Sequence, residues 1–528
     1  MISFVYGKKF LVLIPKPLLM FVFLRSSLLV TAIAVLTAGA QTDFPWNSLV
    51  PTTNFTWTDC YSEFQCARLK VPLDYNDQDN GKYAAVAVIR YPSPVVDKDY
   101  RGPIFLNPGG PGGSAVDAVL EKAKVVRAAV GPQFDVIGFD PRGVSRTTPQ
   151  VAVFKTDEER SAWLLGESYD MNSTYETLPE MVARYQVFGQ LALSRDNDTL
   201  AFITTGIVAQ DMLRILDTLD QEKLQYLGFS YGSVLGSTFA TMFPERVGRM
   251  VIDGCLDMDS YFRYDLANEI RDADKVMQAF FDGCHAAGPE ACPFYASSPT
   301  AIAAKLDAIY DSLRTQPLPV FSGEEYGIIT YDALRNVVFS ALYNPFDQFA
   351  PLALGLAELA SGNGTLIYQS ISQSLIADAS AEATIAISCS DADPVNLGTS
   401  QLREYMSRIN STFAGVFAVR LMTHCVGWEV HPESRFKGPV GANTSFPLLV
   451  IGNTADPVTP LAAAKKTSQL FPGAVLLTQD SPGHTSQSAM SSCTIGAMVA
   501  YFVNGTLPEE GTVCPVESQL FPVANSTS

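Results

Sequence analysis

Residues 228–232 read G-F-S-Y-G, and this short run constrains the fold more than any other feature of the chain. An apolar run precedes it, and small residues of helical character follow it over 233–240. In that context a G-x-S-x-G pattern predicts a nucleophile elbow, a sharp turn between a strand and a helix that needs glycines because side chains there would clash. The pattern therefore predicts an α/β sheet with Ser230 as the nucleophile of a serine hydrolase. Taken alone, it is also typical of a glycine-rich strand end.

Two loops later in the chain carry the acid and the base that such a serine needs. Residues 446–460 form an apolar strand that runs into a loop with Asp456, and residues 474–486 form another strand and turn with His484. Ser, Asp, His is the chain order of this triad in α/β-hydrolases. His484 would take the proton of Ser230 and later protonate the leaving group. Asp456 would orient the imidazole and stabilise the imidazolium.

Two other aspartates compete with Asp456 for the role of acid. Asp480 ends the strand that precedes the turn of His484, and Asp253 lies in V-I-D-G-C at the end of a different strand. We prefer Asp456 because it follows a strand other than that of His484, which is the usual place of the acid in this fold.

A glycine-rich loop at residues 103–114, P-I-F-L-N-P-G-G-P-G-G-S, supplies the next element that the chemistry requires. Glycines allow backbone N–H groups to approach a ligand closely. We assign the oxyanion hole to the N–H groups of Tyr231, the residue after the nucleophile, and of Gly110. A phosphate-binding loop is disfavoured because no G-K-[ST] follows and no G-x-G-x-x-G opens a helix here.

Together these motifs resemble a known family. N-P-G-G-P-G-G-S, then F-D-V-I-G-F-D-P-R-G (134–143), L-G-F-S-Y-G-S and F-P-E-R-V-G-R-M-V-I-D-G (243–254) are similar to the tripeptidyl aminopeptidase-like branch of the prolyl aminopeptidase family of serine α/β-hydrolases. The resemblance covers roughly residues 60–260 and 380–515. It implies exopeptidase activity on peptides with a free N-terminus.

The resemblance also carries residue roles onto this chain. It implies that Ser230, Asp456 and His484 are the triad and that Gly110 is an oxyanion donor. Asp140 and Arg142 match the D-P-R-G turn of the family, and we interpret them as a structural ion pair that fixes a loop. The chain departs from the family after D-P-R-G, where G-V-S replaces the usual extra glycine before serine. Pro108 stands where prolyl aminopeptidases have a histidine, which favours the tripeptidyl branch.

The order of strand-like and helical segments predicts the architecture. Strands alternate with helical segments over 102–258, which indicates a mostly parallel central sheet with helices on both faces. Residues 259–440 are helical in pattern and predict a lid inserted between strands six and seven. We therefore expect a signal peptide (1–40), a first part of the α/β-hydrolase core with the nucleophile (41–258), the lid, and a second part of the core with the acid and the histidine (441–528).

The lid would decide which substrates enter. A covered site excludes long or folded chains, and an aminopeptidase must bind a free α-ammonium, which carboxylates do through charge-assisted hydrogen bonds. Glu429 and Asp391 are the candidates, with Asp393 as a further one, although each is also typical of a solvated or structural carboxylate. Trp428 would either line a pocket or belong to the core.

The N-terminus and the net charge limit the location and the partners. Basic residues precede an apolar run at 28–36, and A-G-A at 38–40 is a small-residue cleavage site, so we predict a secreted, extracellular protein. The alternative is an uncleaved signal anchor, and no other apolar stretch is long enough to span a bilayer. A net charge of −18 disfavours nucleic acids and anionic membranes as partners. We expect peptide substrates and no stable membrane contact after cleavage.

Cysteines and glycosylation sequons support the same compartment. An oxidising compartment predicts disulfides, although sequence alone cannot fix how nine cysteines pair. Pairing the nearest neighbours gives Cys60–Cys66, Cys284–Cys292, Cys389–Cys425 and Cys493–Cys514, with Cys255 as a buried free thiol. No C-x-x-C pair suggests a zinc or redox site, and we expect no metal or organic cofactor. Eight N-x-[ST] sequons follow the signal, at Asn54, Asn172, Asn197, Asn363, Asn410, Asn443, Asn504 and Asn525.

Three functions are compatible with these motifs. The first is a secreted serine exopeptidase that removes short peptides from free N-termini through an acyl-enzyme. The second is an esterase or lactonase that acts on a small secreted metabolite with the same triad, because a fold does not fix a substrate. The third, a non-catalytic binding protein, is disfavoured because the three triad residues are all present.

Overall fold

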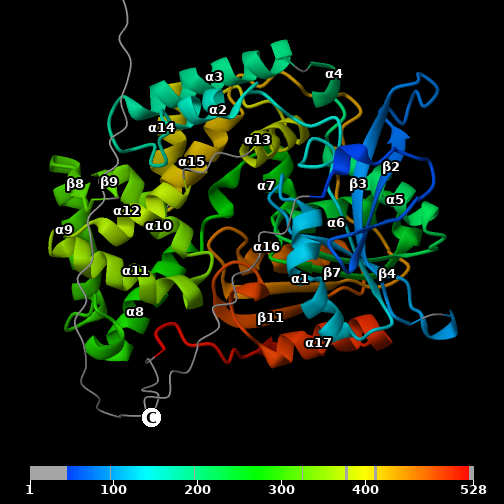
Figure 1. The fold of residues 1–528 in the computed structure, drawn as a ribbon. Coiled ribbons are helices and arrows are strands. Elements are labelled where there is room, and N and C mark those ends of the chain that lie inside the picture. The colour runs from blue at the N-terminus through cyan, green and yellow to red at the C-terminus, as the bar shows by residue number, and fades with distance from the viewer. Residues whose placement is uncertain are drawn as a thin grey trace, which may run out of the picture. The chain divides into compact units, whose positions relative to one another are not determined.

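The computed structural model describes residues 44–95, 97–195, 197–323, 325–374, 379–409 and 413–522. The predicted signal peptide (1–40) lies outside these ranges. Residues from Phe44 onward form one compact unit (Figure 1).

A central sheet organises this unit. In the described ranges ten strands form it, in the order β1-β2-β3-β5-β4-β6-β7-β10-β11-β12. β1, β2, β3 and β5 pair antiparallel in turn, and every other pairing in this sheet is parallel. The prediction of a mostly parallel sheet is thus confirmed. The strands are β1 (Thr58–Cys60), β2 (Phe64–Pro72), β3 (Tyr83–Tyr91), β4 (Pro103–Asn107), β5 (Asp135–Phe139), β6 (Leu224–Phe229), β7 (Val247–Asp253), β10 (Leu449–Ala455), β11 (Val475–Pro482) and β12 (Val513–Cys514).

Helices cover both faces of the sheet, and each face has its own apolar core. The alternation of side chains along a strand explains this division. In β3, Val86 and Val88 face the core that contains α5 and α6, whereas Ala87 and Ile89 face the core that contains α1 and α17. α16 lies against β10 and β11. The helices of the two faces are α1 (Ala115–Val130), α5 (Thr205–Thr218), α6 (Tyr231–Met242), α16 (Leu461–Leu470) and α17 (Ser492–Asn504).

A helical cap is built from two stretches of chain, and Figure 1 shows them meeting beyond the sheet. Counted from β2, β7 and β10 are the sixth and seventh strands, so the predicted insertion between them is present. It contains α7 (Met258–Arg263), η4 (Leu266–Asn268), α8 (Ala273–Ala291), α9 (Pro299–Thr315), the hairpin β8 (Leu318–Phe321) and β9 (Tyr326–Ile329), α10 (Tyr331–Ala341), α11 (Pro345–Ala360), α12 (Thr365–Ser374), α13 (Ser380–Asp391), α14 (Thr399–Arg408) and α15 (Gly415–His424).

The second stretch of the cap lies between β5 and β6, inside the part that the sequence assigned to the core. It contains α2 (Asp157–Leu164), α3 (Thr177–Arg195) and α4 (Asn197–Leu200). In Figure 1, α2 and α3 lie beside α14 and α15 at the top of the view. The predicted lid boundaries at 258 and 440 therefore refer only to the larger of the two stretches, and as boundaries they stay a prediction.

The four predicted disulfides are all confirmed. Cys60–Cys66, Cys284–Cys292, Cys389–Cys425 and Cys493–Cys514 are bonded, and within the described ranges Cys255 is a buried free thiol. Pairing by nearness in sequence succeeds here because each bridge closes a short segment of chain. The five sequon asparagines whose exposure is described all lie at the surface, namely Asn54, Asn172, Asn363, Asn443 and Asn504.

No helix within the described ranges combines the length and the apolar character of a membrane-spanning helix.

The expected ion pair of the D-P-R-G turn is wrong, since its two charged residues have separate partners. Asp140 accepts hydrogen bonds from the Ser114 hydroxyl at 2.7 Å and from the Val116 N–H at 3.1 Å. Arg142 instead forms a two-pronged pair with Asp211, at 2.7 and 2.8 Å, and both side chains are buried. Burial raises the pKa of Asp140 to about 6, against the lowering effect of these hydrogen bonds.

Removing one partner of the buried Arg142–Asp211 pair should strongly destabilise the fold. We expect Asp211→Ala to lower the free energy of unfolding by about 3–5 kcal/mol, because it leaves a guanidinium buried without its countercharge. Chemical denaturation measures this change. Asp217→Ala is the matched control, because Asp217 pairs with Arg246 at a surface position where its side chain is 45% exposed, and there about 1 kcal/mol or less is expected. Equal effects of the two substitutions would contradict the assignment.

Candidate active site

Ser230 lies at the sharp turn between β6 and α6, where the sequence places it. Its backbone has φ 56° and ψ −120°, a strained conformation for a residue with a side chain. Its N–H donates to the Asp253 carbonyl at 2.9 Å. A Cβ at Gly228 would lie 2.6 Å from the Gly232 carbonyl, and one at Gly232 would lie 3.0 Å from the Asn107 carbonyl. The glycines on either side of Ser230 are thus required by close backbone approach.

The loops after β10 and β11 bring Asp456 and His484 together. His484 Nδ1 lies 3.0 Å from both carboxylate oxygens of Asp456, which is fully buried. Burial by itself would raise the pKa of Asp456, but His484 and the N–H groups of Thr485 and Val458 hold it below its usual value. A buried aspartate that stays ionised in this position accepts the Nδ1–H of the imidazole and so orients the ring.

The rival aspartates do not contact His484. Asp480 is exposed and accepts a hydrogen bond from the Thr454 hydroxyl at 3.1 Å. Asp253 is buried, and its carboxylate accepts the N–H and hydroxyl of Ser486. Because the carbonyl of the same Asp253 accepts the Ser230 N–H, this residue ties the serine turn to the histidine loop.

Two residues that sequence reasoning missed hold the acid and the histidine loop in place. The Thr459 hydroxyl donates to Asp456 at 2.7 Å and lies 3.1 Å from His484 Nδ1. Tyr343, from the segment between α10 and α11, accepts the His484 N–H at its carbonyl, at 2.8 Å, and places its ring edge-on to the imidazole. In the sequence, the only sign of Thr459 is its position three residues after Asp456. No motif near Tyr343 indicates that it contacts the histidine loop.

The glycine-rich loop packs directly on the serine turn. A Cβ at Gly109 would lie 2.9 Å from Ser230 Cβ and 3.0 Å from the Tyr231 nitrogen. Asn107 fixes the loop by accepting the Gly109 N–H on its side chain at 3.0 Å. Among the described residues, neither the Gly110 N–H nor the Tyr231 N–H has a protein acceptor. Both N–H groups therefore remain available as donors, and their role as the oxyanion hole stays a prediction.

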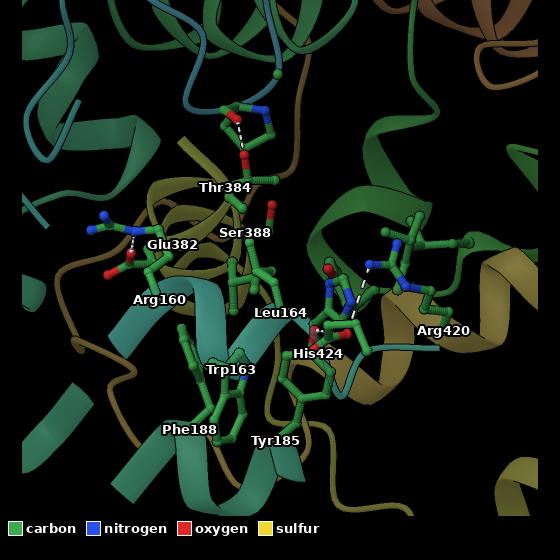
Figure 2. Close-up of a pocket in the computed structure, with 18 of the residues that line it drawn as sticks. Arg160, Trp163, Leu164, Tyr185, Phe188, Glu382, Thr384, Ser388, Arg420 and His424 are labelled. Atoms are coloured by element: carbon green, nitrogen blue, oxygen red, sulfur yellow. Dashed lines mark hydrogen bonds and ion pairs between the residues drawn. The ribbon is translucent and has the colours of Figure 1, made fainter. Parts of the chain in front are cut away.

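A cavity of about 360 Å³ begins at this loop, with Gly110 and Pro111 in its wall, and extends under the cap. The rest of its wall comes from α2, α3, α13 and α15, from Phe154 and Glu167 on either side of α2, and from the segment after β7. Figure 2 shows Trp163, Phe188 and Tyr185 along one side of it. The wall is mostly apolar, which is typical of small-molecule and peptide-end sites.

One end of the cavity contains buried polar atoms without partners. Glu167 Oε2 accepts the Tyr185 hydroxyl at 2.9 Å, but Glu167 Oε1 has no hydrogen-bond partner. The nearest guanidinium nitrogens are those of Arg184 and Arg420, at 3.8 and 3.9 Å from the carboxylate. Arg420 Nε and His424 Nε2 also lack partners, and Figure 2 shows both side chains in the wall. Burial, with a smaller effect of Arg420, lowers the pKa of His424 well below its usual value, so its ring is neutral.

The other carboxylate of the wall is fully engaged. Glu382 accepts the Val153 and Phe154 N–H groups at 2.6 and 3.0 Å and pairs with Arg160 Nε (Figure 2). Buried polar groups normally have partners, and within the described wall of this cavity the buried side-chain atoms without a hydrogen bond belong to Glu167, Arg420 and His424. No motif marks Glu167 in the sequence, because its surroundings come from the packing of α3 and of the distant α15 against the segment that follows α2.

The carboxylates predicted to bind an amino terminus do not line the cavity. Asp391 accepts the Thr205 N–H and hydroxyl and the Tyr261 hydroxyl, and burial raises its pKa to about 6. Glu429 is exposed, and Asp393 is an exposed partner of Arg435. Trp428 is buried and donates to the Ser390 hydroxyl at 3.1 Å, so it belongs to the core.

Comparisons with known proteins agree with this fold and with the motifs. Residues 102–290 match a family model described as the alpha/beta hydrolase fold, and residues 411–514 match one described as TAP-like protein. The chain is 30% identical to serine protease Hip1 of Mycobacterium tuberculosis over 87% of its own length and 90% of that protein. It is 25% identical to tripeptidyl aminopeptidase of Streptomyces lividans, over 87% and 86% of the two chains. It is also 30% identical to carboxylesterase B of M. tuberculosis, over 85% and 86%.

Proposed function

The chain belongs to the TAP-like family of serine α/β-hydrolases, and from this premise we propose that it is a secreted exopeptidase that releases short peptides from free N-termini. Its relatives include proteins named as a serine protease and as a tripeptidyl aminopeptidase. That relationship supports a serine peptidase-like hydrolase, and the cavity under the cap supports the finer specificity.

In the proposed mechanism Ser230 attacks the scissile carbonyl while His484 takes the serine proton. The tetrahedral oxyanion accepts hydrogen bonds from the N–H groups of Gly110 and Tyr231. His484 then gives the proton to the leaving amine, and an acyl-enzyme on Ser230 remains. Water, deprotonated by His484, attacks this ester, and His484 returns the proton to the departing Ser230 oxygen as the N-terminal fragment leaves as a carboxylate. Asp456 stays ionised and stabilises the imidazolium in both steps.

The unpartnered oxygen of Glu167 is the single observation that carries the exopeptidase proposal. An α-ammonium donates to Glu167 Oε1 through a charge-assisted hydrogen bond. The first carbonyl of the same peptide accepts from Arg420 Nε and from His424 in its Nε2-protonated tautomer. These two side chains lie four residues apart on α15 and therefore on one face of that helix. An acceptor atom without a hydrogen bond beside donor atoms without one is the pattern that a peptide amino end satisfies.

The arrangement also explains why cleavage would occur near the chain end. The amino end binds at Glu167, and the scissile carbonyl binds at Gly110, where the cavity begins. The peptide that is released must span the space between them. Because the cap covers this space, a folded or internal segment of a protein does not fit.

Glu167→Gln tests the proposal directly. We expect kcat/KM for tripeptide amides with a free amine to fall by about 10- to 100-fold, the size of a lost charge-assisted hydrogen bond. Hydrolysis of a short-chain ester without an amine should change less than twofold. The measurement is steady-state hydrolysis of chromogenic tripeptide amides with free and acetylated N-termini. Glu429→Gln is the matched control, because Glu429 is an exposed carboxylate of the same cap. Equal turnover of free and acetylated substrates by the native enzyme would contradict the proposal.

A second candidate function is ester hydrolysis on the same triad. It is favoured by the relative named carboxylesterase B and by the mostly apolar wall of the cavity. If only the ester is hydrolysed, and the activity depends on Ser230, the site assignment stands and the peptidase assignment fails.

Secretion is part of the proposal because independent features support it. Four disulfides are typical of an oxidising compartment. The exposed sequons and the predicted signal peptide are compatible with export and glycosylation.

A further inference from the structure

We propose that helix α13 of the cap positions both N–H donors of the oxyanion hole, one through each end of the helix. The proposal rests on the proposed serine hydrolase chemistry, in which Gly110 and Tyr231 form the hole. It holds whether the substrate is a peptide or an ester. Thr384 and Asp391 are the positioning residues, and neither of them contacts the reacting atoms.

The first half of the helix is joined to the glycine-rich loop. The Thr384 hydroxyl donates to the carbonyl of Pro111, the residue that follows Gly110. The same hydroxyl lies 2.8 Å from the Ser380 carbonyl within the helix, so its single proton is shared between the two acceptors. A Cβ at Gly112 would lie 2.7 Å from the Ser380 carbonyl and 2.8 Å from Thr384 Oγ1. The loop and the helix are therefore in backbone contact, and this contact leaves no room for a side chain.

The C-terminal end of the helix holds the residue that carries the other donor. Asp391 accepts the Thr205 N–H at 2.8 Å and the Thr205 hydroxyl at 2.5 Å. The Thr205 hydroxyl lies 2.5 Å from the Tyr231 hydroxyl. Because the Thr205 proton goes to the carboxylate, the Tyr231 hydroxyl must donate to Thr205. Burial raises the pKa of Tyr231 well above its usual value, so the phenol keeps the proton that this relay requires.

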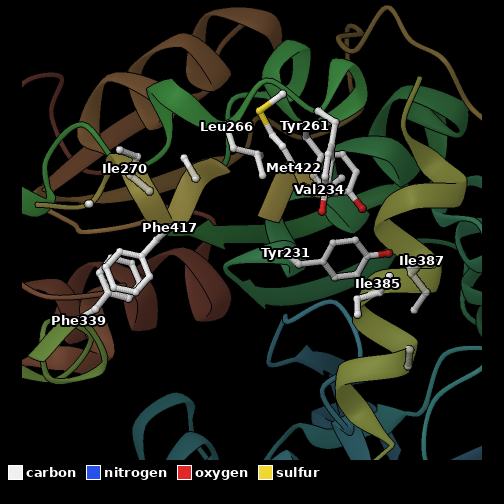
Figure 3. Packing of buried hydrophobic residues seen from close by; sticks show 14 of the residues in the cluster. Tyr231, Val234, Tyr261, Leu266, Ile270, Phe339, Ile385, Ile387, Phe417 and Met422 are labelled. Carbon is white, nitrogen blue, oxygen red and sulfur yellow. The ribbon is translucent and has the colours of Figure 1, made fainter. Parts of the chain in front are cut away.

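The ring of Tyr231 packs in the space between α6 and α13. Figure 3 shows it extending toward α13, on which Ile385 and Ile387 lie nearby. The ring is 2% exposed, and its hydroxyl is fixed by the relay to Asp391. A side chain fixed at its packed ring and at its terminal hydroxyl restricts the backbone of the same residue. That backbone carries the N–H assigned to the hole.

The two positioning residues act through one rigid element. Thr384 and Asp391 are seven residues apart, which places them on the same face of a helix and about 10 Å apart along its axis. Between them, Cys389 is bonded to Cys425 at the end of α15. The helix is thus covalently attached to α15 of the cap, while the face that carries Thr384 and Asp391 contacts the glycine-rich loop and Thr205. The cap therefore contributes to catalysis as well as to substrate access.

The sharpest test replaces the Thr384 hydroxyl without changing the size of the side chain. We expect Thr384→Val to lower kcat for both amide and ester substrates by about 10-fold, with KM within twofold. This is less than the effect of deleting an oxyanion donor outright, about 10²–10³-fold. Thr384→Ser retains the hydroxyl and should restore most of kcat. Tyr231→Phe, which keeps the backbone N–H but breaks the relay at the other end, should lower kcat in the same way.

A second measurement separates positioning from a merely structural role. A peptidyl trifluoromethyl ketone forms a tetrahedral adduct with Ser230 whose oxyanion occupies the hole. Its inhibition constant should rise about 10-fold in Thr384→Val, in parallel with the loss of kcat/KM, while the thermal midpoint stays close to that of the native enzyme. If kcat falls but the inhibition constant does not change, or if only stability falls, the proposal is overturned.

Measurements on the native enzyme show whether the positioning role of α13 is wrong or the proposed serine hydrolase function is wrong. If the native protein neither hydrolyses any substrate nor is labelled at Ser230 by a fluorophosphonate, the serine hydrolase chemistry itself is wrong. If the native protein is active and Thr384→Val and Tyr231→Phe equal it, only the role of α13 is wrong.

Discussion

Ser230→Ala is expected to abolish hydrolysis of amides and esters alike, with kcat lower by about 10⁴- to 10⁶-fold. The substitution removes the only atom that forms the acyl-enzyme, and the oxyanion hole and the cavity then provide a small residual rate. Among the described contacts the Ser230 side chain makes no hydrogen bond, so the fold should be unaffected. The measurement is steady-state turnover of a tripeptide amide and a short-chain ester, together with labelling by a fluorophosphonate.

A serine in the same helix provides the matched control for this experiment. Ser237 lies two turns further along α6 than the nucleophile, and its hydroxyl is buried without a partner. Ser237→Ala should leave kcat and labelling unchanged and should not reduce stability, because it removes an unsatisfied buried group. Substantial activity in Ser230→Ala, or its loss in Ser237→Ala, would show that the nucleophile has been assigned to the wrong residue.

Asp456→Asn should lower kcat by about 10⁴-fold while substrate binding is retained. An asparagine amide does not stabilise the imidazolium, and it favours the tautomer of His484 that cannot accept the serine proton. The carboxylate accepts four further hydrogen bonds, from the Val458 and Thr459 N–H groups on one oxygen and from the Thr485 N–H and the Thr459 hydroxyl on the other. The single amide oxygen of asparagine retains the pair on one side only, because the amide NH2 group does not accept hydrogen bonds. The measurement is kcat and KM for the amide and the ester between pH 5 and 9.

Substitutions of the two rival aspartates show whether Asp456 is the acid of the triad. Asp480→Asn should stay within twofold of the native kcat, since the exposed carboxylate contacts Thr454 and not His484. Asp253→Asn should weaken the contact with Ser486 and so disturb the histidine loop. Its kcat should fall much less than that of Asp456→Asn. A loss of activity in Asp480→Asn equal to that in Asp456→Asn would reassign the acid.

The parts of the site that depend on local sequence could be predicted. The serine turn needs glycines at fixed positions, and the acid and the histidine follow apolar strands whose ends meet at one edge of a parallel sheet. The places of Ser230, Asp456 and His484 at the strand ends could therefore be predicted from motifs and order, while their catalytic roles stay a prediction. The disulfides could be paired because the bonded cysteines are near neighbours in sequence. Each of these inferences requires only the neighbouring residues and the direction of the strands.

The cavity could not be predicted, because its properties arise from long-range packing. Glu167 lies in a short segment between α2 and α3 with no motif, and contacts with Tyr185, Arg184 and Arg420 give it its environment. Asp391, which looked available in the sequence, is occupied by Thr205 and Tyr261. A sequence shows which residues carry charge but does not show which charges already have partners.

The D-P-R-G turn illustrates the same limit at closer range. Asp140 and Arg142 are two residues apart and of opposite charge, yet they point to different parts of the core. Asp140 holds the start of α1, and Arg142 reaches Asp211 on α5. Proximity in sequence predicted a mutual pair because it could not show the competing partners on other elements.

The construction of the cap from two separate insertions has a consequence for how enzymes of this kind can diverge. The proposed triad lies on loops of the sheet, whereas most of the cavity wall comes from the chain between β5 and β6 and between β7 and β10. Mutations, insertions and deletions in those stretches can change the preferred substrate while the chemistry is inherited intact. Helix α13 is the exception, since it lines the cavity and also contacts the glycine-rich loop and Thr205. New specificities should therefore evolve through α2, α3 and α15 more readily than through α13. A substitution in α13 that changes substrate preference would also lower kcat.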